Sequence, residues 1–197
     1  MASSIEDLIK LIKRLPGMGD KSASRLAYHL IKTDDNYNKA LGEAIYTIKD
    51  RVHPCPQCGC YTENDICEYC SSDTRDRKVI CVVEDAQGVL TIASSGAYNG
   101  LFHVLGGAID PLNGKGPEDL SFPLLMERVE KLKPEEIIIA TNPTEAGDTT
   151  ALYIRRLMKD HPEITLSRPA SGLPIGGDLG YADKLTLSRS LRTRVKL

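Results

Sequence analysis

Four cysteines in two closely spaced pairs constrain this chain more than any other feature of its sequence. The segment CPQCGCYTENDICEYC contains Cys55 and Cys58 as one Cys-x-x-Cys pair, and Cys67 and Cys70 as a second. Each pair lets a tight turn direct two thiolates at one ion, and two pairs complete the tetrahedral shell that zinc prefers. Because four cysteines leave no position for water, we expect one structural zinc ion per chain.

Two rival interpretations of the cysteines are a redox dithiol and a pair of disulfides. The first residues, MASSIEDLIKLIKRL, lack the continuous apolar core of a secretory signal. We therefore expect a reducing cytoplasm, where metal ligands or free thiols are more common than disulfides. Cys60 could compete as a ligand, whereas Cys81 lies in an apolar run and is expected in the core. No apolar run approaches the roughly 18–20 residues that a membrane span needs.

After Arg77 the sequence alternates between apolar β-forming runs and helical patterns. The expected strands cover 79–84, 101–107, 136–141 and 164–170, and the expected helices cover 85–94, 118–132 and 144–159. Strands that are apolar on both faces indicate a parallel sheet covered by helices. We expect an α/β fold with small helical and zinc modules. The predicted domains are a helical region (1–53), a zinc finger (54–76), the parallel α/β domain (77–173) and a glycine-rich, basic segment (174–197).

The first domain is expected to contain three helices, at 5–12, 22–32 and 37–51. Apolar residues of the third helix recur at helical spacing and should form a buried face, namely Ala40, Leu41, Ala44, Ile45 and Ile48. In the C-terminal segment, glycine pairs and Pro174 indicate an irregular loop, and Asp183 should begin a terminal helix.

The stretch LIKRLPGMGDKSASRLAYHL predicts two helices joined by a turn with two glycines. Such a turn exposes backbone N–H groups at the start of the next helix, where a phosphate binds well. Lys21 and Arg25 lie four residues apart and hence on one face of that helix. The stretch resembles a helix-hairpin-helix element, which implies binding to the backbone of single- or double-stranded DNA without sequence preference. The alternative is a plain αα-hairpin with glycines for close packing.

Charge is distributed unevenly along the chain. Residues 1–32 carry six basic and three acidic side chains, and residues 184–197, which include Lys196, carry five basic and no acidic ones. Because the net charge is −2, the middle carries ten net negative charges. Basic ends around an acidic body indicate a polyanion bound at the termini and a different partner for the middle.

The α/β segment resembles a Toprim domain, in which a Glu after the first strand and Asp-x-Asp-x-x-Gly after the third bind magnesium. Glu84 takes the first position here, but Asn142 and Thr144 replace the two aspartates, while Gly147 remains. An amide and a hydroxyl bind a hard divalent cation far more weakly than two carboxylates do. We therefore expect neither magnesium nor phosphoryl-transfer chemistry. Thr144 is expected to cap the helix that follows.

Four acidic residues remain near this edge of the sheet: Glu84, Asp85, Glu145 and Asp148. They could bind a metal weakly, but we expect them to form an acidic docking face for a basic partner. Two other classes stay open as alternatives, a magnesium-dependent Toprim nuclease or nucleotidyl transferase and an RNA-binding zinc protein.

The order of these motifs resembles the RecR family of bacterial recombination proteins along essentially the whole chain. Matching stretches are ATNPTEAGD, SGAYNGLFHVLGGAIDPLNGKGPEDL and SGLPIGGDLGYADKLTLSRSL. The resemblance implies a mediator of recombinational DNA repair without its own catalysis. Such a protein acts with RecO and RecF to load recombinase on gapped or single-stranded DNA. It also implies that residues 1–53 bind DNA, that residues 174–197 take part in oligomerisation, and that dimers or ring-like tetramers clamp DNA. A cytoplasmic location at the nucleoid and a RecO surface around Glu84 and Glu145 are further implications.

Overall fold

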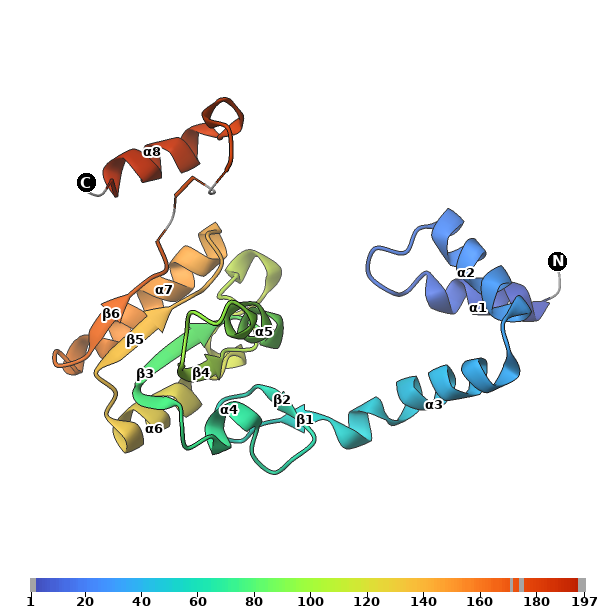
Figure 1. Cartoon of the computed structure of the whole chain (residues 1–197), viewed down its shortest axis with the longest axis horizontal. Helices are drawn as coiled ribbons and strands as arrows, with labels where there is room; N and C mark the ends of the chain where they lie inside the picture. The colour runs from blue at the N-terminus through green and yellow to red at the C-terminus, as the bar shows by residue number, and fades with distance from the viewer. Residues whose placement is uncertain (1–2, 171, 174–175, 195–197) are drawn as a thin grey trace. The chain divides into compact units, whose positions relative to one another are not determined.

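The structure is a computed structural model that describes residues 3–170, 172–173 and 176–194. Pro174 of the expected loop and Lys196 of the basic end lie outside the described residues. The chain divides into two compact units, residues 1–52 and 53–197 (Figure 1). No helix in the described part of the chain is both long enough and apolar enough to span a bilayer.

The first unit contains the three predicted helices, α1 (Ser3–Ile12), α2 (Asp20–Lys32) and α3 (Asp35–Arg51). Its small core lies between α1 and α2, where Ile12 packs against the fully buried Ala23 and Ala27. The two alanines let the helices approach closely. Gly17 adopts a positive φ of 76° in the turn between them, a conformation that favours glycine.

The prediction of a buried face on α3 was wrong for the first unit. No residue of α3 is buried, and Leu41, Ile45 and Ile48 are 36%, 67% and 50% exposed. The core between α1 and α2 includes no residue of α3. The apolar spacing correctly predicted the helix, but no neighbouring element of its own unit covers that face.

The second unit is built on a parallel sheet of four strands, which confirms the predicted α/β fold. The strand order is β4 (Gly100–Val104), β3 (Asp76–Val83), β5 (Glu136–Ile139) and β6 (Thr165–Ser167). The connections contain α5 (Ala86–Ser94), α6 (Phe122–Leu132), α7 (Glu145–Leu157) and short 3₁₀ turns. These turns cover Pro111–Asn113, Pro117–Asp119 and Met158–Asp160. Because β4 and β5 flank β3 on opposite sides, the strand order reverses at β3, and the carboxyl ends there form the usual ligand crevice of such sheets.

The two faces of this sheet pack against different elements. Alternate residues Ile80 and Val82 of β3 belong to a core shared with α6 and α7. Cys81 and Val83 face the other way, into a core with α5 and the cysteine segment. Alternation of side chains along a strand therefore divides β3 between two cores.

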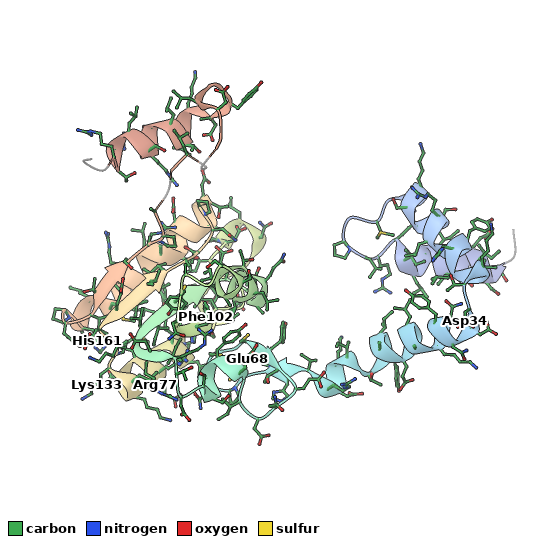
Figure 2. The ribbon with its side chains drawn as sticks, viewed as in Figure 1. Asp34, Glu68, Arg77, Phe102, Lys133 and His161 are labelled. Carbon is green, nitrogen blue, oxygen red and sulfur yellow. The ribbon has the colours of Figure 1, made fainter. Side chains whose placement is uncertain are left out.

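The cysteine segment packs directly on the sheet. It contains a short antiparallel pair, β1 (His53–Pro54) with β2 (Tyr61–Thr62), and the helix α4 (Glu68–Ser71). Its cysteines and Tyr69 share a core with Phe102 and Val104 of β4. Figure 2 shows Phe102 on β4 near α4, which carries Glu68.

The segment also covers the free edge of β4. The N–H of Val104 donates to the carbonyl of Cys58 at 2.7 Å, and Arg75 donates to the carbonyl of Gly100 at 2.8 Å. An edge strand otherwise leaves such groups unpaired.

The C-terminal part contains a 3₁₀ turn (Leu179–Tyr181) and α8 (Lys184–Arg192). As the sequence predicts, Asp183 begins the last helix, because its carboxylate accepts from the N–H groups of Leu185 and Thr186, each at 2.9 Å. A side-chain acceptor at this position satisfies N–H groups that the helix cannot pair.

Candidate functional site

The four paired cysteines form one buried cluster. The Sγ atoms of Cys55, Cys58, Cys67 and Cys70 all lie within 4.8 Å of one another, and all four residues are buried. Zinc–sulfur bonds of about 2.3 Å in a tetrahedron place sulfurs roughly 3.8 Å apart. The Sγ atoms of Cys58 and Cys67 are 3.4 Å apart. The donor set and its spacing therefore fit one zinc ion with no open position.

Local backbone geometry brings each pair together. In the first pair the N–H groups of Cys58 and Gly59 donate to the carbonyl of Cys55 at 3.3 and 2.9 Å, and Gly59 has a φ of 75°. In the second pair, Cys67 precedes α4 and its carbonyl accepts from the N–H of Cys70 at 3.0 Å. These are the tight turns that the Cys-x-x-Cys spacing predicts.

The other two cysteines have different positions. Cys60 is buried beside the cluster but outside the group of four, and its carbonyl accepts from the N–H of Cys55 at 2.7 Å. Cys81 lies in the core, as expected, and burial raises its pKa to about 12, so its thiol stays protonated. All six cysteines are free in the structure, which therefore contains neither of the two disulfides considered as an alternative.

Beside this cluster lies a buried cation, Arg128, that was not predicted from the sequence. Arg128 on α6 is 6% exposed and donates from one guanidinium nitrogen to Sγ of Cys70 at 3.3 Å. A second nitrogen donates to the carbonyl of Phe102. The available signal was its spacing, since Arg128 follows Leu125 by three residues and precedes Leu132 by four, on the apolar face of the helix.

Next to Arg128, the imidazole of His103 is fully buried. Its Nε2 lies 3.0 Å from the hydroxyl oxygen of Ser121. Burial, with a smaller effect from the charge of Arg128, lowers the pKa of His103 from 6.5 to about 3. His103 is therefore neutral in the folded protein at neutral pH.

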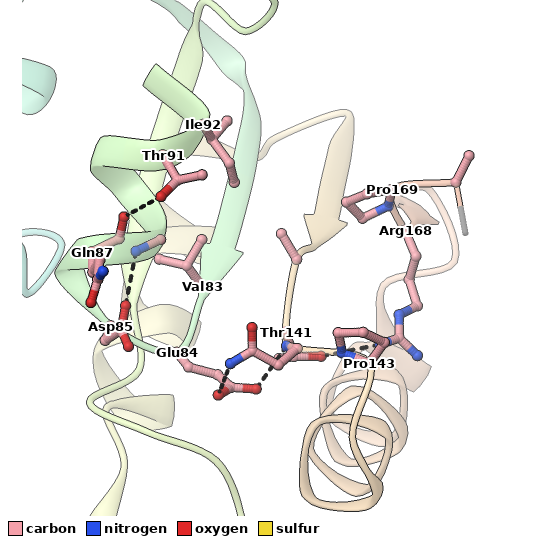
Figure 3. A pocket seen from close by; sticks show the side chains of 14 residues that line it. Val83, Glu84, Asp85, Gln87, Thr91, Ile92, Thr141, Pro143, Arg168 and Pro169 are labelled. Atoms are coloured by element: carbon pink, nitrogen blue, oxygen red, sulfur yellow. Dashed lines mark hydrogen bonds between the residues drawn. The ribbon is translucent and has the colours of Figure 1, made fainter. Parts of the chain in front are cut away.

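The Toprim-like edge of the sheet forms an open pocket of about 550 Å³ at the carboxyl ends of β3 and β5. In Figure 3 the carboxylate of Glu84 reaches from the end of β3 towards the loop after β5. There the backbone N–H of Asn142 donates to one oxygen of Glu84 at 2.8 Å, and the side-chain amide donates to the other at 2.7 Å. Both carboxylate oxygens are thus held by neutral donors of one residue.

The loop that carries Asn142 is locked to the start of α7. The N–H of Thr144 donates to the carbonyl of Asn142 at 2.8 Å, and the hydroxyl of Thr144 accepts from the N–H of Gly147 at 3.1 Å. Thr144 therefore caps α7, as the sequence predicts. Gly147 is buried against the carbonyl of Asn142, with no room for a Cβ atom. The glycine of the Toprim pattern is therefore required for packing in this chain, although both aspartates are replaced.

The other acidic residues of this edge have surroundings that differ from those of Glu84. Asp85 caps α5 by accepting from the N–H of Gly88 at 2.8 Å. Asp148 pairs with Arg168 at 2.7 Å and with Arg189 of α8 at 3.3 Å. The hydrogen bond from Arg168 is the main cause that holds the pKa of Asp148 below its usual value. Glu145 is exposed in the first turn of α7.

In the first unit, Lys21 and Arg25 are both exposed on α2, one turn apart. Gly19 is the N-cap of this helix and provides no side-chain cap. Asp20, the acidic neighbour of Lys21, forms an ion pair with Lys13 at 2.5 Å. This pair reduces the negative potential at the start of α2, where a phosphate would approach.

Comparison with known families covers nearly the whole chain. The Toprim domain family matches residues 78–170. Three further families match, all described as parts of RecR: its helix-hairpin-helix (residues 5–49), its four-cysteine zinc finger domain (52–72) and its C-terminal region (172–195). The zinc finger match agrees with the buried four-cysteine cluster, so the predicted structural zinc site is confirmed.

Individual relatives agree with the family matches. Recombination protein RecR of Treponema denticola is 52% identical over 194 residues, which are 98% of this chain and 99% of the relative. The proteins of the same name from Treponema pallidum and Rubrobacter xylanophilus are 47% and 45% identical, over 98% and 100% of this chain and 96% and 98% of the relatives. These relatives match nearly the full length of the chain, and its helix-hairpin-helix and zinc finger regions match those of RecR. The chain therefore belongs to the RecR family of recombination proteins.

Proposed function

We propose that this protein is a non-catalytic DNA-binding mediator of recombinational repair, acting in the cytoplasm at the nucleoid. It works with RecO and RecF to load recombinase on gapped or single-stranded DNA. The proposal that the protein is non-catalytic rests on the two hydrogen bonds that Asn142 donates to the carboxylate oxygens of Glu84, at 2.8 and 2.7 Å.

This contact replaces the interaction that a Toprim enzyme needs. A metal ion that assists phosphoryl transfer requires several oxygen ligands with enough negative charge to bind it. Here the one carboxylate at the end of β3 has both oxygens occupied by N–H donors. Asn142 and Thr144 contribute an amide and a hydroxyl where the enzyme pattern has carboxylates. The Toprim fold then acts as a rigid scaffold.

The hairpin of the first unit supports contact with the DNA backbone. Lys21 and Arg25 present two cations on one helix face, next to the N-terminus of α2. Both features attract phosphates irrespective of base sequence.

Exposed apolar residues support assembly into a clamp. Leu41, Ile45 and Ile48 line one face of α3, and Leu11 and Leu15 are 60% and 54% exposed elsewhere in the same unit. A soluble chain rarely exposes so many large apolar side chains unless another chain covers them. We propose that a second copy covers α3 and that several copies together form a ring around DNA.

The acidic edge of the second unit is proposed as the surface for RecO. Contacts within the chain fix the positions of the carboxylates of Glu84, Asp85 and Asp148, and Glu145 is exposed at the start of the same helix as Asp148. A fixed acidic surface favours a basic partner and raises its association rate.

The DNA-binding proposal is tested with the double variant Lys21→Ala and Arg25→Ala. Each phosphate contact contributes roughly 0.9 to the log–log salt slope on duplex DNA and roughly 0.7 on single strands. The variant should bind more weakly, with a slope smaller by about 1.4 to 1.8. Lys10→Ala is the control, because Lys10 pairs with Asp7 at 3.1 Å. An unchanged slope in the double variant would remove the hairpin from the interface.

The ring is tested by measuring particle mass with circular and with linear DNA. A closed clamp should stay on circular DNA at high salt and slide off linear DNA of equal length. Equal release from both would contradict a ring. Magnesium-dependent cleavage or joining of DNA, abolished by Glu84→Gln, would contradict the non-catalytic assignment.

A further inference from the structure

Arg128 is a buried cation without a carboxylate partner in the described part of the chain. Its residue is 6% exposed, and it contacts the carbonyl of Phe102 and Sγ of Cys70. Its Nε has no hydrogen-bond partner. A buried guanidinium is costly unless an opposite charge compensates it. The structure must therefore supply a negative charge nearby.

The cysteine cluster supplies that charge in its metal-bound form. Four neutral thiols carry no charge. Four thiolates around one zinc ion carry two net negative charges, and the Sγ of Cys70 at 3.3 Å from Arg128 is one of them. A guanidinium donating to a thiolate is a charge-assisted hydrogen bond, which is stronger than one to a neutral acceptor.

The position of Arg128 also joins three elements. It extends from α6 past the edge of the sheet, where it meets the carbonyl of Phe102 on β4, to Cys70 in α4. One planar side chain with several N–H donors can make both contacts at once. A lysine carries its three N–H donors on a single nitrogen and therefore cannot reproduce contacts made from two nitrogens of one planar group.

We propose that Arg128 is a positioning residue of the zinc centre, which holds the thiolate of Cys70 in place and compensates the charge of the metal-bound cluster from the α/β domain. Zinc binding is thereby linked to the packing of α6 on the sheet. Residues that hydrogen-bond to metal ligands commonly contribute about 10- to 100-fold to metal affinity.

The test is competition for zinc between the folded full-length protein and a chromophoric chelator. Arg128→Met keeps much of the side-chain volume and removes the charge, so its zinc affinity should fall about 10- to 100-fold. The control is Lys131→Met, which removes an exposed positive charge one turn further along the same helix and should leave the affinity unchanged. A wild-type affinity in folded Arg128→Met would overturn the proposal, whatever its unfolding temperature.

A second measurement separates a contact with sulfur from general loss of packing. Without the hydrogen bond from Arg128, the thiolate of Cys70 should react faster with an alkylating reagent than in the wild type, while the rate at Cys55 changes less. Peptide mass mapping gives both rates. Equal acceleration at the two cysteines would indicate general loosening and would also overturn the proposal.

If Arg128→Met does not fold, Arg128→Lys decides the question. It keeps the positive charge but loses the two-armed geometry, so we expect weaker zinc binding, by up to about tenfold, and faster alkylation of Cys70. Wild-type values for both measurements would overturn the proposal.

Discussion

Gly147→Ala tests whether the close approach of two backbone segments maintains the contact between Glu84 and Asn142. Gly147 lies in the first turn of α7, directly against the carbonyl oxygen of Asn142. A Cβ atom there would overlap that oxygen and lie 3.0 Å from Oε1 of Glu84. The carbonyl would have to withdraw by about 1 Å or more to regain ordinary separation.

The expected cost follows from the contacts that such a movement disturbs. Asn142 makes two hydrogen bonds to the carboxylate of Glu84, at 2.8 and 2.7 Å, and its carbonyl accepts from Thr144 at 2.8 Å. A hydrogen bond to a charged group contributes about 1.5–3 kcal/mol, less where water reaches it. Alanine regains about 1 kcal/mol of helix propensity. We therefore expect a net loss of about 2–4 kcal/mol in the free energy of unfolding.

Chemical denaturation monitored by circular dichroism measures this loss. The control is Gly42→Ala, because Gly42 also lies in a helix, α3, but has no atom within 4 Å of the added Cβ. That substitution should stabilise its helix by up to about 1 kcal/mol. Two helical glycines would thus respond with opposite signs. If Gly147→Ala were as stable as the wild type, the close approach would not hold the Glu84–Asn142 contact and the reasoning would fail.

Three further predictions concern the cores and the uncovered helix face. Zinc removal by a chelator should lower the unfolding temperature of the whole second unit, because the cysteine cluster shares a core with Phe102; a sheet that melts unchanged in calorimetry would contradict this. The pKa of His103 is lowered from 6.5 to about 3, so this group costs no stability above pH 6.5, where it is neutral in both the folded and the unfolded protein. As pH falls from 6.5 towards 3, the unfolded chain binds a proton that the folded protein does not, and stability decreases by up to about 1.4 kcal/mol per pH unit. Denaturation between pH 6.5 and about 5 should therefore show a shallower slope for His103→Asn and the wild-type slope for His29→Asn, which changes an exposed histidine. Ile45→Glu should dissociate the proposed oligomer in light scattering, whereas Lys39→Glu, at an exposed position on the opposite side of α3, should not. Equal masses for wild type and Ile45→Glu would exclude the α3 face from assembly.

Features that depend on residues a few positions apart could be predicted from the sequence alone. Two Cys-x-x-Cys pairs predicted the zinc centre, because each pair is closed by one local turn. Apolar β runs alternating with helical patterns predicted the parallel sheet, and Thr144 and Asp183 predicted helix starts, since capping involves residues two or three apart. The replacement of two aspartates at positions 142 and 144 was also visible, because the pattern is contiguous.

Contacts between groups far apart in the sequence could be identified only from the folded chain. Glu84 and Asn142 are 58 residues apart, as are Cys70 and Arg128, and no local pattern predicts either contact. The apolar spacing of α3 predicted a buried face, yet burial depends on a neighbour that the described residues of the first unit do not provide. The periodicity of apolar residues indicates which face of a helix or strand a side chain occupies. The residues that it contacts depend on how helices and strands pack against one another, and local periodicity contains no information on that packing.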